Sequence, residues 1–329
     1  MPTRPLLLAA LLALAALAAP AAARAQEAAA RFPSRSIHLI VPFPAGGPAD
    51  LVARLIGQRM SEDWGQPVII ENRAGANTII AAQAAAKAAP DGYTLLMAID
   101  STLVMNQLLY KSLPYDPLAD FAPVSLTSKT VSVLAVSAAT GPRTVKELIA
   151  RAKAAPGKLT YGGGTITAQL MGHLFHRAAG LDILYVPFKG TPDTLNGLLT
   201  GSVDLIYAAN VIVAPVIESG AVRALARLAR AAPASMAGIP PLAEAAGLPD
   251  LEDVSVWLGL VAPHGTPAPI IAKLNAEVAR ILADPALKQK AERTGNYPVT
   301  STPEEFARFI RREADRWSRV IAELHLKLD

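Results

Sequence analysis

The sequence predicts an α/β protein of two domains, with mainly parallel sheets, a cleft between the domains and a hinge of two chain crossings. Three observations indicate this fold. Apolar runs rich in β-branched residues alternate with segments of helical period along most of the chain. About 300 residues remain when the first 25 are set aside, which exceeds the usual size of a single core. Two stretches dense in proline, 114–123 and 231–253, separate the α/β units.

The first 25 residues have the layout of a secretory signal peptide. Arg4 precedes an apolar run of leucine and alanine, and Ala23-Arg24-Ala25 stands before Gln26 as an A-x-A cleavage site. A membrane anchor is the alternative, but Pro20 ends the run after roughly 15 residues, and about 20 are needed to span a bilayer. We expect cleavage near Ala25–Gln26 and export to the periplasm.

The charge balance and the cysteine count exclude several classes of function. The chain has 31 basic and 27 acidic residues, so losing Arg4 and Arg24 with the signal peptide leaves a net charge near +2. Nucleic-acid binding normally requires a clustered basic face, which this balance does not support. Without cysteine the chain forms neither a disulfide nor a thiolate metal site. We expect an exported monomer that binds no nucleic acid.

The first predicted domain, residues 31–130, opens with strands separated by helices. Its strands are 37–43, 67–72 and 93–99, and helices follow the first two of them. Strands that are connected through helices run parallel in one sheet.

The second predicted domain, residues 131–254, repeats this alternation. A capping box at Thr144 and Glu147 starts its first helix. Residues 255–329 then return to complete the first domain, and a capping box within Thr302–Glu305 starts the last helix. The predicted strands of the second domain are 131–139, 159–163, 183–188, 203–209 and 222–228.

Four strand-to-helix junctions carry glycine, proline or hydroxyl residues where a helix begins. The first N–H groups of a helix lack partners, and ligands of parallel α/β sheets lie at the carboxyl ends of the strands. Any one junction is also consistent with a tight turn alone, but several in one chain favour a shared anion site. The junctions are Gly46-Gly47-Pro48, Ser101-Thr102, Gly162–Thr167 and Gly190-Thr191-Pro192.

A small organic acid suits these junctions better than a nucleotide. Neither GxxxxGK[ST] nor GxGxxG occurs in them, so we expect no cofactor. Asp50, near the third position of its helix, offsets the positive end of the dipole and so favours a screened or water-bridged carboxylate. Lys189 adjoins the last junction and is either a carboxylate contact or a solvated lysine on a turn.

The sequence lacks the motifs of catalytic and metal sites. It has no GxSxG elbow, and His173 and His176 form an HxxH pattern without the acidic partner of a zinc site. An exported hydrolase is the alternative and would need a nucleophile near Ser101 or Thr165, but no histidine accompanies these loops. We therefore expect neither an enzyme nor a metal site.

The order of its short segments gives the chain a family resemblance. The segments are PFPAGGPAD, GQPVIIENRAGA, KAAPDGYTLL, LPYDPLADFAPV, APGKLTYGG, VPFKGTPDTLNGLLTGSVDL, VRALA, WLGLVAP, LNAEV and TPEEFARFI. From about Phe32 to the C-terminus they resemble the substrate-binding proteins of tripartite tricarboxylate transporters, also called Bug-type receptors.

The resemblance implies a type 2 periplasmic-binding-protein fold and the function of a solute receptor. Such a receptor closes its two domains on a small di-, tri- or aromatic carboxylate and delivers it to the membrane permease subunits of the transporter. The alternative is a sensing role, in which the loaded receptor presents itself to a two-component sensor kinase.

The resemblance also implies which residues contact the solute. It places one carboxylate, partly through water, at the loop PFPAGG, and the other three junctions complete the pocket. The implied contacts are Phe43, Ala45, Gly46, Gly47, Ser101, Thr102, Gly163, Gly164, Thr165, Thr167, Lys189, Gly190 and Thr191.

Departures from the family pattern fall in this pocket. The glycine loop is shorter than usual, and Asn77 and Thr78 stand where glycines are usual. Ala208 replaces a polar residue, often Asp, and so removes a partner for a ligand amino group, whereas Asp100 could supply one from another direction. Asp100 and Ala208 are therefore the predicted specificity residues.

Overall fold

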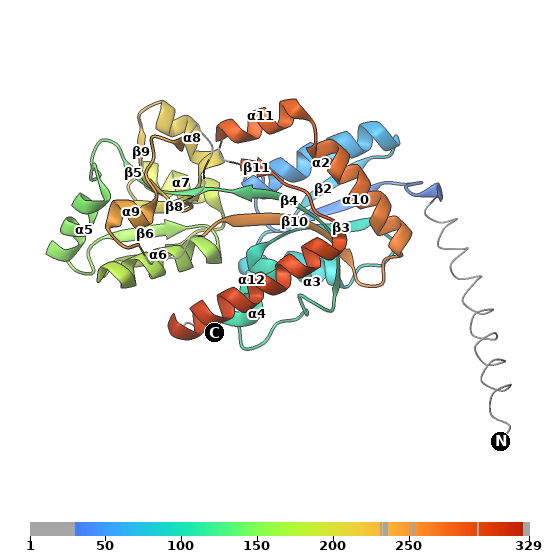
Figure 1. The fold of residues 1–329 in the computed structure, drawn as a ribbon, viewed down its shortest axis with the longest axis horizontal. Coiled ribbons are helices and arrows are strands. Elements are labelled where there is room, and N and C mark those ends of the chain that lie inside the picture. Colours follow the sequence, from blue (N-terminus) through green and yellow to red (C-terminus); the bar gives the residue numbers. More distant parts are fainter. Residues whose placement is uncertain are drawn as a thin grey trace, which may run out of the picture.

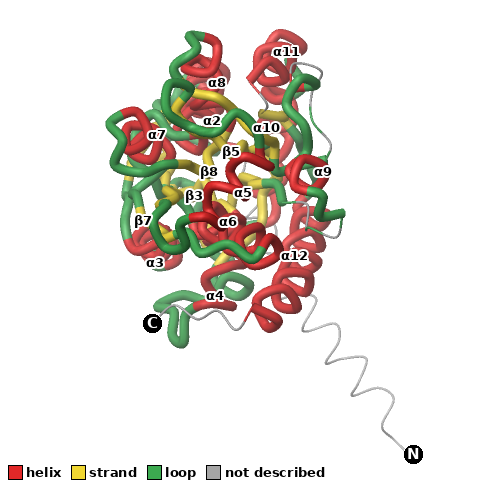
Figure 2. The backbone as a smooth tube through the Cα atoms, turned by 90° about the vertical axis from the view of Figure 1, so that its left-hand side faces the viewer, coloured by secondary structure: helices red, strands yellow, loops and turns green. Residues whose placement is uncertain are grey.

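The chain forms two lobes, each built on one β-sheet with helices around it (Figure 1). The computed structural model describes residues 30–230, 232, 236–249, 251, 254–294 and 296–324. The predicted signal peptide, residues 1–25, lies outside them. Figure 2 shows the strands in the interior and the helices outside, which agrees with the predicted α/β class.

Lobe 1 is built on a six-stranded sheet of order β11-β4-β10-β3-β1-β2. The apolar run of β1 is buried along most of its length, as expected of a strand covered on both faces. The strands are β1 (Ile37–Val41), β2 (Val68–Asn72), β3 (Thr94–Ile99), β4 (Phe121–Thr130), β10 (Val256–Pro263) and β11 (Asn296–Pro298). The helices are α2 (Pro48–Trp64), α3 (Ile79–Ala86), α4 (Asn106–Leu109), α10 (Ala268–Leu282), α11 (Pro285–Thr294) and α12 (Pro303–Leu324), with a 3₁₀ turn η1 (Ala76–Thr78) and a π-helix η2 (Ser101–Met105).

Lobe 2 is built on a five-stranded sheet of order β7-β6-β8-β5-β9. Its helix α5 begins at the predicted capping box, where the Thr144 hydroxyl accepts the N–H of Glu147 at 3.1 Å. The strands are β5 (Ser132–Ser137), β6 (Thr160–Gly163), β7 (Leu184–Pro187), β8 (Leu205–Ala209) and β9 (Val222–Arg227). The helices are α5 (Val145–Ala154), α6 (Ile166–Ala179), α7 (Thr191–Leu199), α8 (Asn210–Glu218) and α9 (Leu242–Ala246).

The predicted fold class is confirmed, and both sheets are mixed, with most strands of each sheet running in one direction. In lobe 1, β1 is parallel to β2 and β3, but β10 is antiparallel to β3 and β4. In lobe 2, β6 is parallel to β7 and β8, but β5 is antiparallel to β8 and β9. The physical reason is the hinge. A strand that arrives from the other lobe enters its sheet at the carboxyl ends of the resident strands and runs against them.

The two crossings lie side by side between the lobes (Figure 1). A single buried residue, Val131, separates the end of β4 from the start of β5. The return crossing runs from the end of β9 to the start of β10, and β10 then pairs with β4 along its whole length. No helix among the described residues is long and apolar enough to cross a membrane.

Candidate functional site

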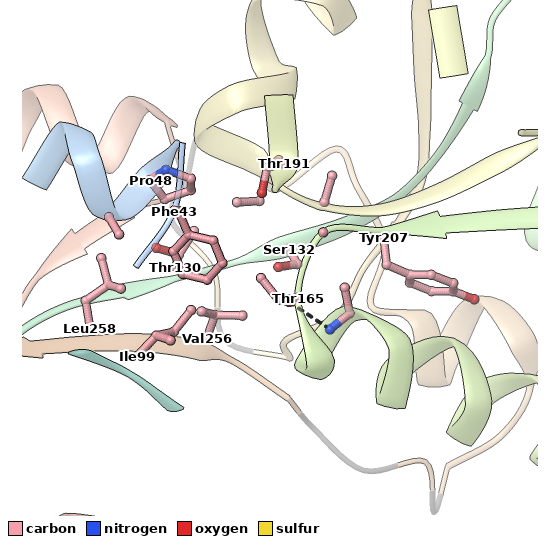
Figure 3. A pocket seen from close by; sticks show the side chains of 15 residues that line it. Phe43, Pro48, Ile99, Thr130, Ser132, Thr165, Thr191, Tyr207, Val256 and Leu258 are labelled. Carbon is pink, nitrogen blue, oxygen red and sulfur yellow. Dashed lines mark hydrogen bonds between the residues drawn. The ribbon is translucent and has the colours of Figure 1, made fainter. Parts of the chain in front are cut away.

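Two cavities lie between the lobes, and Phe43, Gly164 and Thr165 line both of them. The first, here called the hinge-side cavity, has a volume of about 40 Å³ (Figure 3). It is lined by Phe43, Pro48, Ala49, Ile99, Thr130, Ser132, Gly164, Thr165, Ala168, Thr191, Tyr207, Ala208, Ala209, Val256 and Leu258. The second, the loop-side cavity, has a volume of about 230 Å³. It is lined by Pro42, Phe43, Gly75, Ala76, Asn77, Thr78, Ser101, Gly164, Thr165, Ile166, Phe188 and Lys189.

Three helices begin at the wall of the hinge-side cavity. Pro48 is the first residue of α2, Thr191 is the first residue of α7, and Thr165 is the N-cap of α6. The Thr165 hydroxyl accepts the N–H of Ala168 at 3.0 Å (Figure 3). Each helix start carries a partial positive charge, and no acidic side chain lines either cavity. The arrangement therefore favours an anion.

Two glycines allow the loops of lobe 2 to meet backbone to backbone. A methyl group on Gly164 would lie 2.3 Å from the carbonyl carbon of Gly190, far inside any real contact. On the other side of Gly190, a methyl group would lie 3.4 Å from Cδ of Pro44, which belongs to lobe 1. The loops of the two lobes thus lie almost in contact at the site.

Asp50 holds the loop between β1 and α2 in place. Its carboxylate accepts bonds from the Gly46 N–H, Arg54 Nε and Asn72 Nδ2, each at 2.9 Å. Asn72 Nδ2 also donates to the Phe43 carbonyl at 3.0 Å, so both ends of the loop are tied to one network. Burial alone raises the pKa of Asp50, but the bonds with Arg54, Gly46 and Asn72 outweigh it and hold the pKa below its ordinary value.

Replacing Asp50 by asparagine is expected to loosen this loop. The amide cannot accept all three bonds and loses the charge that pairs with Arg54, so the free energy of unfolding should fall by about 1–3 kcal/mol. Urea denaturation measures the change. Glu62→Gln on the exposed face of the same helix is the control and should shift stability by less than about 0.5 kcal/mol. Equal stabilities of the two variants would contradict the role of Asp50.

Asp100 is buried where the two lobes meet. Only 1% of its surface is exposed, and it accepts bonds from the backbone N–H and the hydroxyl of Ser101 at 2.6 and 3.3 Å. Thr167 faces it from α6 of lobe 2. Burial raises the pKa of Asp100 to about 7, and the negative charge of Glu313 adds to this. The nearby Thr167 hydroxyl and the hydrogen bonds from Ser101 act in the opposite direction.

The histidines of the HxxH pattern lie within the packing of lobe 2. His176 Nε2 lies 3.0 Å from the Tyr207 hydroxyl, and burial followed by the charge of His173 lowers the pKa of His176 to about 3. Across the described part of the chain, no group of three or more His, Cys, Asp or Glu side chains could hold a metal ion.

Comparison with known proteins identifies the family. The model of the tripartite tricarboxylate transporter family receptor matches residues 52–326. The chain belongs to this receptor family. A UPF0065 protein of Pseudomonas sp. (strain P51) is 37% identical over 299 residues, which are 90% of this chain and 88% of the relative. The members are solute receptors and not enzymes.

Solved structures agree with this family. A structure described as a periplasmic transporter is 38% identical, with a TM-score of 0.85 over 91% of this chain and all of that chain. Rpa4515 of R. palustris, solved with adipate, is 34% identical, with a TM-score of 0.86 over 90% of this chain and 99% of that chain. The receptor therefore has the two-domain α/β fold of periplasmic binding proteins.

The residues predicted to contact the solute divide into two groups in this receptor. Some line a cavity and others line neither cavity. The first group is Phe43, Ser101, Gly164, Thr165, Lys189, Thr191 and the predicted specificity residue Ala208. The second group is Ala45, Gly46, Gly47, Asp100, Thr102, Gly163, Thr167 and Gly190.

Several members of the second group have other partners. Gly46 donates its N–H to Asp50. The Thr102 hydroxyl is fully buried and donates to the Thr78 hydroxyl at 3.0 Å. Thr167 is fully buried against Asp100. Thr102 and Thr167 are therefore buried beside cavity-lining residues and do not face a cavity themselves.

Sequence reasoning missed other residues of the walls. Ile99, Thr130, Ser132, Tyr207, Val256 and Leu258 line the hinge-side cavity (Figure 3), and Thr78 lines the loop-side cavity. Thr130 and Ser132 flank the crossing at Val131, where residues 127–132 are mostly polar, so no local pattern distinguishes these two side chains. Thr78 likewise gave no signal apart from its departure from the glycine of the family pattern.

Proposed function

We propose that the protein is a periplasmic receptor for a small organic carboxylate that it delivers to the membrane permease of a tripartite tricarboxylate-type transporter. The observation that carries the proposal is the convergence of three helix N-termini on one cavity between the lobes. Membership of the receptor family and the adipate bound to a relative of similar fold support it.

The hinge-side cavity suits the carboxylate itself. Thr130, Ser132, Thr165 and Thr191 supply hydroxyls there, and the three helix starts supply partial positive charge. A volume of about 40 Å³ holds a group of carboxylate size but not a whole ligand. The remainder of the ligand would occupy the loop-side cavity beyond Phe43 and Thr165.

Domain closure is the proposed mechanism. The loops of the two lobes nearly touch at Pro44 and Gly190, and Asp100 of lobe 1 meets Thr167 of lobe 2. The lobes must therefore part before a ligand enters. Parting requires only a change in the backbone angles of the two crossings, of which one is reduced to Val131. Closing then replaces the water around the carboxylate by helix N–H groups and hydroxyls.

Titration calorimetry tests the proposed function. We expect the purified protein without its first 25 residues to bind one equivalent of at least one acid in a panel of mono-, di-, tri- and aromatic carboxylates. The neutral diamide of the best diacid, or the amide of the best monoacid, should not bind, because the helix starts are aimed at negative charge. If no carboxylate gave heat or raised the melting temperature, the proposal would be overturned.

A further inference from the structure

Three consecutive residues beside the loop-side cavity have left-handed backbone angles. Ala76, Asn77 and Thr78 have φ values of 44°, 48° and 77°, and none of them is glycine. This conformation is rare for any L-residue and is most unfavourable for a β-branched one such as Thr78. Such conformations persist only where surrounding contacts fix them, and they cluster at ligand-binding sites.

A network of side chains from η2, α4 and the segment after α4 fixes this loop. Asn106 Nδ2 lies 2.9 Å from the Asn77 carbonyl and 3.3 Å from the Thr78 hydroxyl. The Thr102 hydroxyl donates to the Thr78 hydroxyl at 3.0 Å. The Tyr115 hydroxyl, in turn, donates to the Thr102 carbonyl at 2.8 Å. The position of Thr78 is therefore set by residues distant in the sequence.

In the same network, the hydroxyl proton of Thr78 has no acceptor. Both partners of its hydroxyl, Thr102 and Asn106, act as donors, and a hydroxyl has one proton of its own to donate. Among the described residues, the Thr78 hydroxyl takes part in hydrogen bonds only as an acceptor. Thr78 is only 2% exposed and lines the loop-side cavity, so a ligand in this cavity is the available acceptor.

Lys189 lines the same cavity from lobe 2. Among the described residues that line the two cavities, Lys189 is the only one with a charged side chain. A ligand oxygen placed in the loop-side cavity would meet a hydroxyl of lobe 1 and an ammonium group of lobe 2. Such a pair of donors suits a carboxylate better than a neutral group.

We propose that Thr78 is a specificity-determining residue, which together with Lys189 binds the end of the solute that lies in the loop-side cavity and selects a solute with a second carboxylate at that end. This rests on the proposed function, in which the first carboxylate lies at the helix starts of the hinge-side cavity. The two ends of the ligand are then recognised by different chemistry. One end meets hydroxyls and helix dipoles, and the other end meets one hydroxyl and one full positive charge.

Matched pairs of ligands test the proposal by calorimetry. The pairs are succinate and butyrate, glutarate and pentanoate, and adipate and hexanoate, each a diacid and the monoacid of equal length. We expect the wild type to bind at least one diacid about tenfold or more tightly than its monoacid. Thr78→Val should reduce this preference by about tenfold, and Thr78→Ser, which keeps the hydroxyl, should retain it. Lys189→Met should also reduce it.

Further outcomes separate this inference from the proposed function. If the wild type bound monoacids as tightly as diacids, the dicarboxylate inference would be wrong and the proposed function would stand. If Thr78→Val weakened both members of a pair equally, Thr78 would have a structural role only. If the wild type bound no carboxylate at all, the proposed function itself would fail. Thr102→Val is the structural control. It removes the hydroxyl that donates to Thr78 but leaves the Thr78 hydroxyl in place. This variant should therefore have a lower melting temperature and keep the preference for diacids.

Discussion

Replacing Gly164 by alanine is expected to reduce carboxylate affinity by roughly a hundredfold. The added methyl group would lie 2.3 Å from the carbonyl carbon of Gly190 and 2.6 Å from both its Cα and its carbonyl oxygen. All three are backbone atoms, so the clash cannot be relieved by a rotamer change. The first turns of α6 and α7 would be pushed apart, and their N–H groups would no longer converge on the hinge-side cavity.

Gly47→Ala is the matched control for this substitution. A methyl group on Gly47 would lie 3.6 Å from the Pro44 carbonyl oxygen, which is an ordinary contact, and the φ of Gly47 is −79°. We expect the control variant to bind within about threefold of the wild type. Calorimetry with the best ligand of the panel gives both affinities, and circular dichroism shows that the variants are folded. Wild-type affinity in Gly164→Ala would contradict the proposed packing of the two loops.

Carboxylate affinity is expected to fall steeply as the pH rises towards 7. The ordinary pKa of an aspartate is 3.8, and burial in the closed structure raises the pKa of Asp100 to about 7. Parting of the lobes would take Thr167 and the start of α6 away from Asp100, so we expect water to reach the carboxylate and its pKa to return towards the ordinary value. Closure therefore takes up a proton between these two values. Protonation of Asp100 contributes fully to the free energy of closure below pH 3.8, and this contribution is lost as the pH rises through 7. Carboxylate affinity should therefore fall by up to about tenfold per pH unit from pH 5.5 to 7.

The pH profile of Asp100→Asn provides the control. Asparagine cannot ionise, so the affinity of this variant should not fall over the same range. Ionisation of the ligand's own carboxylates acts in the opposite direction, because it strengthens binding as the pH rises. Glu313 is the other acidic group that acts on Asp100, and Glu313→Gln should move the steep region to lower pH. A wild-type affinity that stayed constant from pH 5.5 to 8, or an equal slope in Asp100→Asn, would contradict the burial of Asp100 on closure.

The elements that sequence reasoning predicted well are those with local signals. The start of α2 was predicted from two glycines and a proline in the first helical position, and the start of α5 from one capping box. Each of these signals lies within a few residues of the feature it predicts. The end of β1 at Val41 was placed two residues too late, because the apolar run continues through Pro42 and Phe43 after the ladder ends.

The features that could not be predicted depend on contacts between distant segments. The direction of β5 and β10 follows from where the chain enters each sheet, and no local pattern records it. Thr102 was expected to face the ligand because it follows a strand, but its hydroxyl donates to Thr78, 24 residues earlier. The left-handed angle of Thr78 likewise requires Asn106, 28 residues later, to hold it.

A crystal structure of the protein with the tightest-binding carboxylate of the panel would show whether the two cavities between the lobes hold the solute. We expect one carboxylate of the ligand in the hinge-side cavity, within hydrogen-bond distance of N–H or hydroxyl groups at the starts of α6 and α7. The rest of the ligand should extend past Phe43 and Thr165 into the loop-side cavity. A carboxylate bound outside both cavities, or between lobes that make no contact near Gly190, would contradict this expectation.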